Sequence, residues 1–137
     1  MEQLTGSCLC GSLKYTCNSG PLFTAACHCK TCQKSTGSAF SVVVGVQRAD
    51  MTIEGNTRTT YEGLGDSGQP TYRHFCSQCG STIMAEMAAQ PDLAFIAAGT
   101  LDHPEALTPQ LHVYWRDHQP WLETLANLPQ HDTMPQQ

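Results

Sequence analysis

Seven of the eight cysteines fall into three tight groups, and thiols spaced in this way are typical of metal sites. The groups are Cys8 and Cys10; Cys27, Cys29 and Cys32; and Cys76 and Cys79. A Cys-x-x-Cys pair followed by glycine, as in the last group, forms a tight turn that directs both sulfurs at one ion while the glycine takes the left-handed conformation. Such a turn supplies two ligands, so it requires two more from elsewhere in the chain.

The first pair can supply the two missing ligands. Cys8 and Cys10 are separated by one residue, so in a strand they would lie on the same face, and a turn at Gly11 would let both bind one ion. Together with Cys76 and Cys79 they predict a closed four-thiolate zinc site. Because this site ties the start of the chain to its centre, the free energy of zinc binding would become folding free energy.

The triplet Cys27, Cys29 and Cys32 predicts a second ion with one coordination position open, which is the pattern of a catalytic zinc. Three thiolates make zinc a weaker Lewis acid than three imidazoles do. It should therefore activate water poorly and accept a soft fourth ligand such as a substrate thiol. The alternatives are a redox cluster, or a second structural site that is completed by His28, His74 or Cys17.

The residues around the triplet allow more than one interpretation. His28 lies between two of the expected ligands and should point away from the metal, and Cys17 is expected to be a buried core thiol. Lys30 and Lys34 could offset the −1 charge of a three-thiolate zinc centre, attract an anionic thiol substrate, or form an ordinary solvated face. His74 and His112 are candidates for proton transfer, with a structural role as the alternative for each.

Composition excludes several classes of protein. The chain has 137 residues, 40% of them hydrophobic, and a formal charge of −5, so a nucleic-acid partner is not expected. No apolar run approaches the roughly 20 residues of a spanning helix, and the start has no export signal, so we expect no membrane partner and a cytoplasmic location. Thiols stay reduced there, and eight cysteines then favour metal binding over disulfides.

Short strand-like runs separated by turn residues predict an all-β or β-rich fold in a single domain over 1–137, with a loosely ordered tail at about 130–137. The expected strands are 12–16, 39–46, 51–55, 57–63, 70–75, 81–87, 92–101 and 111–115. Two short helices are expected, one over 30–37 that ends at Gly37 and one over 120–128 with Pro120 in its first turn. Phe40, Trp115 and Trp121 are expected in the core, with an exposed contact patch as the alternative.

Five motifs in the same order resemble the glutathione-dependent formaldehyde-activating enzyme family, which shares a domain with centromere protein V. The motifs are GSCLCGSLKY, CHCKTCQKSTGSAF, FCSQCGSTI, AAGTLDHPEAL and PQLHVYWRDHQPWLETLANLPQH. The resemblance implies a β-tent-like fold of antiparallel sheets with two zinc ions per chain. The structural zinc would be held by Cys8, Cys10, Cys76 and Cys79, and the catalytic zinc by Cys27, Cys29 and Cys32. The family often has Arg after the third cysteine of the triplet, where this chain has Gln33.

Two functions from different classes follow. The resemblance implies a zinc-dependent carbon–sulfur lyase such as S-(hydroxymethyl)glutathione synthase, which joins glutathione and formaldehyde, so the expected partner is a small thiol such as glutathione. The alternative is a non-catalytic, zinc-stabilised protein-interaction module, which the small size of the chain favours. A homodimer is compatible with either function.

Overall fold

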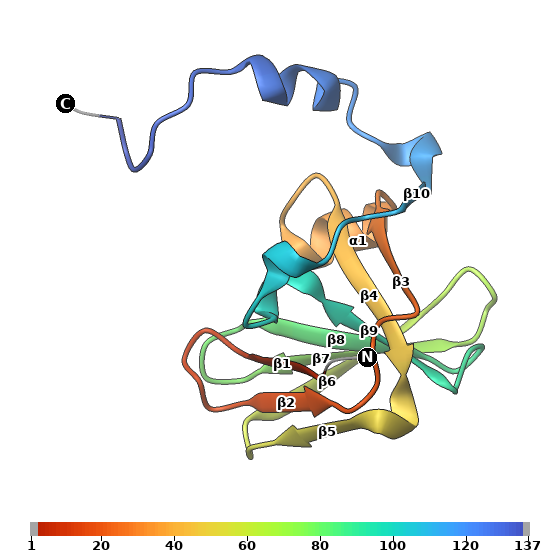
Figure 1. Ribbon diagram of the computed structural model, residues 1–137. Helices are drawn as coiled ribbons and strands as arrows, with labels where there is room; N and C mark the ends of the chain where they lie inside the picture. The colour runs from red at the N-terminus through yellow and green to blue at the C-terminus, as the bar shows by residue number, and fades with distance from the viewer. Residues whose placement is uncertain (1–2, 136–137) are drawn as a thin grey trace.

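The structure, a computed structural model, describes residues 3–135 and consists of two β-sheets with one short α-helix (Figure 1). The smaller sheet has the order β1 (Leu4–Ser7), β2 (Lys14–Cys17), β5 (Met51–Glu54). The larger sheet has the order β10 (Leu111–Val113), β3 (Phe23–Cys27), β4 (Ser41–Gln47), β9 (Leu93–Ala97), β8 (Thr82–Met87), β7 (Pro70–Cys76), β6 (Arg58–Leu64). The helix is α1 (Lys30–Thr36), and the 3₁₀ turns are η1 (Arg48–Asp50), η2 (Ala98–Thr100), η3 (Pro104–Ala106), η4 (Trp115–Asp117) and η5 (Leu122–Asn127).

The prediction of a β-rich fold is confirmed, and each of the eight expected runs overlaps a strand. Strands β1 and β3 were not among the expected runs. The sequence LTGS of β1 has only one strongly apolar residue, and FTAAC of β3 has small alanines where β-branched residues would signal a strand. The expectation of antiparallel sheets is wrong for one pair, because β10 lies parallel to β3. The chain reaches β10 through a long connection from β9, which allows it to enter the edge in the same direction as β3.

The buried side chains form one core that joins the two sheets. Tyr15 and Cys17 from β2 pack in the same cluster as Val44 from β4 and Ile96 from β9. Cys17 is fully buried, which confirms its prediction as a core thiol. Close packing also requires a glycine at position 45 on β4, because a Cβ atom there would lie 2.3 Å from the ring of Phe23 on β3.

The helix that carries part of the cysteine triplet begins and ends as its sequence predicts. The thiol of Cys29 accepts a hydrogen bond from the backbone N–H of Cys32 and caps the first turn. Gly37 ends the helix in the left-handed conformation with φ 66°, and its N–H donates to the carbonyl of Gln33. These caps set the direction of the short helix and therefore the position of its side chains.

The prediction of a second helix over 120–128 is wrong. Residues 122–127 form the 3₁₀ turn η5, without a buried residue, and Trp115 and Trp121 are 42% and 47% exposed, so their expected place in the core is wrong. Trp115 instead packs at the surface against the rings of His112 and His118. Figure 1 shows the segment around η5 running clear of both sheets, so its apolar side chains have no sheet surface to pack against. The expected tail at 130–137 is exposed and lacks helix or strand as far as residue 135, and its last two residues lie outside the described part.

None of the helices within residues 3–135 has the length and apolar character needed to cross a membrane.

A polar network joins η1 to the larger sheet. The carboxylate of Glu86 on β8 accepts hydrogen bonds from Arg48 Nε and His74 Nε2, each at 2.6 Å, and Thr60 lies 2.8 Å from His74 Nδ1. Partial burial of Glu86 opposes its ionisation, but the bonds to His74 and Arg48 and the charge of Arg48 outweigh it and lower the pKa of Glu86. The network therefore stabilises the fold when Glu86 is ionised.

We predict that Glu86→Gln lowers the free energy of unfolding by about 1–2 kcal/mol at pH 7. Urea denaturation would measure this loss, with the exposed Glu62→Gln as a control that changes stability by about 0.5 kcal/mol or less. Because the folded pKa of Glu86 is lowered, its contribution is full above the ordinary pKa of 4.5 and is lost as the pH falls below it. The difference between wild type and variant should shrink in that acidic range, and a constant difference would contradict the assignment.

Candidate metal centres

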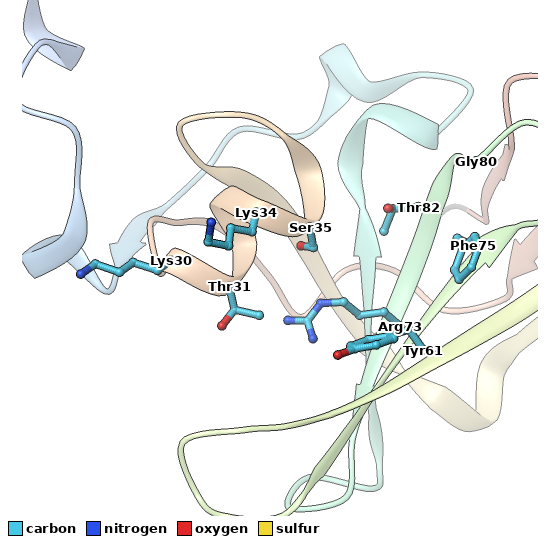
Figure 2. Close-up of a pocket in the computed structure, with 9 residues that line it drawn as sticks. All are labelled: Lys30, Thr31, Lys34, Ser35, Tyr61, Arg73, Phe75, Gly80 and Thr82. Atoms are coloured by element: carbon cyan, nitrogen blue, oxygen red, sulfur yellow. The ribbon is translucent and has the colours of Figure 1, made fainter.

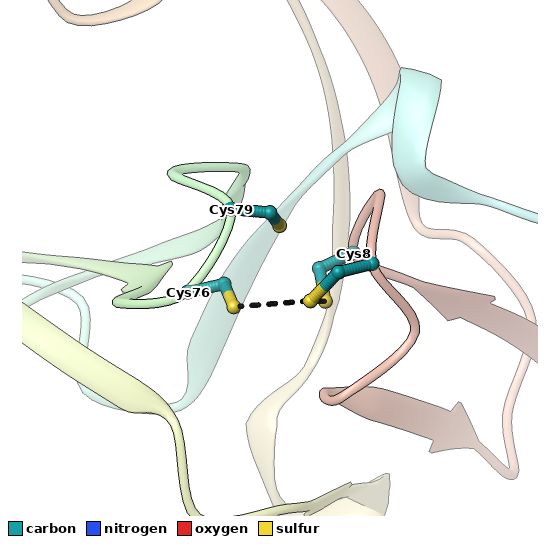
Figure 3. A group of neighbouring side chains, drawn as sticks. Cys8, Cys76 and Cys79 are labelled. Atoms are coloured by element: carbon teal, nitrogen blue, oxygen red, sulfur yellow. Dashed lines mark hydrogen bonds between the residues drawn. The ribbon is translucent and has the colours of Figure 1, made fainter.

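The first four cysteines come from two similar turns at the junction of the sheets. Cys8 and Cys10 lie on the turn after β1, whereas Cys76 ends β7 and Cys79 lies on the turn before β8. Figure 3 shows the turn of Cys76 and Cys79 facing Cys8 from the other turn. The glycine after each pair has the left-handed conformation, with φ 81° at position 11 and 80° at position 80, as the sequence predicts for the second pair.

The distances among these four sulfurs match a tetrahedral zinc site. All four lie within 4.8 Å of one another, with 3.7 Å from Cys8 to Cys10 and 3.8 Å from Cys10 to Cys76. Zinc–sulfur bonds of about 2.3 Å in a tetrahedron place the sulfurs about 3.8 Å apart. The donors therefore fit a zinc ion closely.

Local donors favour the thiolate forms that a metal requires. Backbone N–H groups point at two of the sulfurs, from Leu13 to Cys8 at 3.3 Å and from Gln78 to Cys76 at 3.4 Å. The hydroxyl of Ser12 lies 3.2 Å from the sulfur of Cys76, and this bond is the main reason that the pKa of Cys76 falls to about 5. Ser12 thus lowers the cost of deprotonating Cys76 when an ion binds.

The triplet forms a second, separate group. Cys27 ends β3, Cys29 caps α1 and Cys32 lies in its first turn, and their sulfurs lie within 4.8 Å of one another. Within residues 3–135 no further Cys, His, Asp or Glu belongs to this group. A metal ion held here would accordingly have three ligands from the described chain and a fourth position for another molecule.

The residues that could have completed this second group are engaged elsewhere. The His28 ring is buried and its Nε2 atom lies 2.8 Å from Nδ1 of His112, so it is turned away from the sulfurs as expected. His74 is bound to Thr60 and Glu86, and Cys17 lies in the core. Both histidines considered for proton transfer, His74 and His112, are thus held in hydrogen bonds with other side chains.

Hydrogen bonds link the three thiols of the second group. A hydrogen bond from Cys27 is the largest of the effects that lower the pKa of Cys32 to about 5, and the same bond, together with burial, raises the pKa of Cys27. The positive charge of Arg73 on β7 also favours the Cys32 thiolate. Cys32 is consequently the most readily ionised of the three.

Gln33, at the position where the family often has Arg, fastens the chain after β10 to the loop that carries the triplet. Its side-chain Nε2 donates to the carbonyls of His28 at 2.8 Å and Asp117 at 3.1 Å, and its Oε1 accepts from Gln119 at 2.7 Å. All three partners are satisfied by an uncharged amide that both donates and accepts. In this chain the position therefore has a structural role that the sequence alone did not indicate.

Tyr114 and Asp66 also lie near the triplet, although no sequence motif pointed to them. Tyr114 has a left-handed backbone with φ 54°, the only such non-glycine residue in the described chain, and its hydroxyl donates to Asp66 at 2.6 Å. This bond is the main reason that the pKa of Tyr114 rises to about 12, and the charges of Cys29 and Cys27 add to the effect. Strained conformations of this kind persist where surrounding contacts hold them, often near functional sites.

A pocket of about 620 Å³ separates α1 from the strands beside it (Figure 2). Its lining residues are Lys30, Thr31, Lys34, Ser35, Tyr61, Arg73, Phe75, Gly80 and Thr82. Both lysines singled out in the sequence thus lie at the pocket, although Figure 2 shows the amine of Lys30 pointing away from it. The sequence did not indicate Arg73, because strand pairing alone brings β7 opposite the triplet.

Comparison with known proteins shows the family and the fold. A family model described as glutathione-dependent formaldehyde-activating enzyme matches residues 3–117. A Halomonas elongata protein with that provisional name is 26% identical over 88% of this chain and 80% of its own length. An Emericella nidulans protein with the same provisional name is 32% identical over 53% of this chain, but over only 36% of its own length. A solved Rhodobacter sphaeroides protein shares the fold with a TM-score of 0.62 and 16% identity, and the match covers 80% of this chain and 99% of that one.

We predict that the two cysteine groups differ in what their loss does to the protein. Cys32→Ser should lower the zinc content from about two ions per chain to about one and leave the protein folded. Cys76→Ser should lower the zinc content as well and, unlike Cys32→Ser, should lower the free energy of unfolding by about 3 kcal/mol or more. The reason is that the first group joins distant parts of the chain. Elemental analysis and thermal unfolding would measure both effects.

The matched control is Cys17→Ser, which removes a core thiol outside both groups. This variant should lose stability but keep both ions. If it loses as much zinc as Cys32→Ser does, the division of the cysteines into two metal groups and a core thiol is wrong.

Proposed function

The chain belongs to the glutathione-dependent formaldehyde-activating enzyme family, and we propose that it joins a small thiol to a small carbonyl compound, with glutathione and formaldehyde as the substrates. In this proposal Cys27, Cys29 and Cys32 hold a catalytic zinc, and Cys8, Cys10, Cys76 and Cys79 hold a structural one. The observation that carries the proposal is the group of three converging sulfurs without a fourth protein ligand among the described residues, next to an open pocket.

The chemistry asked of the site is the formation or cleavage of one carbon–sulfur bond. A zinc ion on three thiolates would supply a position that binds a thiol sulfur and lowers its pKa. The thiol loses its proton to solvent, its sulfur lone pair forms the bond to the carbonyl carbon, and the carbonyl π electrons move to oxygen, which takes a proton from water. The product is a hydroxymethyl thioether, and the reverse sequence releases both reactants.

The residues of this chain would contribute positioning and charge. Holding the thiol beside the carbonyl turns a bimolecular step into one that is nearly unimolecular. Lys30 and Lys34 on α1 would attract an anionic thiol toward the pocket, as expected from the sequence. The hydrogen bonds of Gln33 and the bond between Tyr114 and Asp66 hold the chain after β10 against this side of the site. A reducing location such as the cytoplasm would keep the thiols of both sites available for metal.

A second candidate is a zinc-stabilised interaction module without catalysis, and one observation favours it. The chain after β10 exposes several large apolar side chains, which are typical of a protein contact surface. They are Tyr114, Trp115, Trp121, Leu125, Leu128 and Met134. None of these side chains belongs to either cysteine group, so the two functions can be distinguished by changing the triplet.

We predict that the zinc-loaded protein accelerates exchange between free glutathione and S-hydroxymethylglutathione above the uncatalysed rate, as measured by NMR exchange spectroscopy. Cys32→Ser should reduce this acceleration about 100-fold or more, because the variant loses a ligand of the catalytic zinc. Lys14→Gln, on the exposed face of β2, should change it less than twofold.

Wild-type protein that holds both zinc ions but leaves the exchange rate at its uncatalysed value with glutathione and formaldehyde would contradict the proposed reaction. If, in addition, the binding of a protein partner to the chain were unchanged in Cys32→Ser, the interaction module would be the better account.

A further inference from the structure

The lining of the pocket beside α1 is basic. Three of its lining residues are Lys30, Lys34 and Arg73, and none is acidic. The ion pairs found within residues 3–135 use other residues. The amine of Lys30 points away from the hollow, so Lys34 and Arg73 are the cations whose charges an anion bound there would offset.

The side chain of Arg73 lines this pocket with few of its hydrogen-bond donors in use. Figure 2 shows its guanidinium pointing across the hollow toward Thr31 on α1. In the described chain its side chain donates one hydrogen bond, to the hydroxyl of Thr71 at 3.3 Å. A guanidinium has five N–H groups, so most of its donors are left to face the pocket.

The pocket and the triplet share the helix α1. Cys32 lies on the same short helix as Thr31 and Lys34, and both of these residues line the pocket together with Arg73. A zinc ion with three thiolates would carry a charge of −1, which offsets only one of these cations. We take the remaining positive charge to be available to the rest of a thiol whose sulfur is bound at the triplet.

We propose that Arg73, assisted by Lys34, determines substrate specificity by binding a carboxylate of the thiol whose sulfur reaches the triplet. A planar guanidinium binds a carboxylate with two parallel hydrogen bonds, which gives direction as well as charge. The hydroxyls of Thr31, Ser35 and Thr82 supply further donors in the lining. The substrate is thus a thiol that carries at least one carboxylate, and neutral thiols are poor substrates. This inference rests on the proposed function, because it assumes that a thiol binds at the triplet.

A purely structural role for Arg73 has a different signature. If Arg73 only balances the charge of the cysteine thiolates, its loss should weaken the binding of every thiol by a similar factor. If it binds the carboxylate, its loss should weaken acidic thiols and leave neutral ones unchanged. The ratio of two dissociation constants therefore separates the two roles.

The test uses the full chain loaded with cobalt, whose visible absorption changes when a fourth thiolate binds. The probes are glutathione and glutathione diethyl ester, which have the same thiol but differ in their carboxylates. In wild type, glutathione should bind about tenfold more tightly than the ester. In Arg73→Gln this preference should fall to about twofold, with the affinity for the ester unchanged, and in Arg73→Gln/Lys34→Gln it should vanish.

The control is Lys14→Gln, which removes the same charge from the other sheet and should keep the tenfold preference. Arg73→Lys should recover part of the preference, because it restores the charge without the planar geometry. If Arg73→Gln keeps the wild-type ratio, or weakens both probes equally, the specificity role is wrong while the proposed function stands. If neither probe changes the cobalt spectrum of wild type, the proposed function is wrong as well.

Discussion

The rest of the molecule depends on one constraint, which is the convergence of four cysteine sulfurs from the small sheet and the large sheet. Cys8 and Cys10 follow the first strand, and Cys76 and Cys79 lie on either side of the turn between β7 and β8. As thiolates, four sulfurs at these distances would repel each other unless an ion neutralised their charge. With a zinc ion in place, the small sheet is fixed against the large one, and the core between them can close. The position of β7 relative to α1 is set by strand pairing within the large sheet.

That position creates the second site, which has a different chemical character. The triplet lies at the end of β3 and the start of α1, and β7 presents Arg73 to the same hollow. The helix is only seven residues long, so its direction depends on the Cys29 and Gly37 caps and on the bonds of Gln33 to the chain after β10. A closed group of four thiols and an open group of three are thus built from the same residue type. The difference between them is that one is surrounded by backbone turns and the other faces a cationic pocket.

The sequence predicted the parts of this arrangement that depend on local pattern. Spacing and glycines were enough to group the cysteines, because a metal knuckle is defined within five residues, and the caps of α1 are equally local. The position of Arg73 could not be predicted, since it results from the pairing of β6, β7 and β8 at long range. The roles of Tyr114 and Gln33 depend on where the chain after β10 is placed, which no local signal sets. The helix expected over 120–128 failed for a related reason, because an apolar face predicts packing only if the fold offers a surface opposite it.

The central claim is that the triplet holds an ion with one position open to a thiol. Zinc K-edge X-ray absorption on the fully loaded protein tests it most directly, because the method counts the sulfur atoms bound to zinc. A four-thiolate site and a three-thiolate site together give an average of about 3.5 sulfurs per zinc, and the average should rise to about 4 when glutathione is added. An average that starts at about 4, or that does not change with glutathione, would contradict the claim.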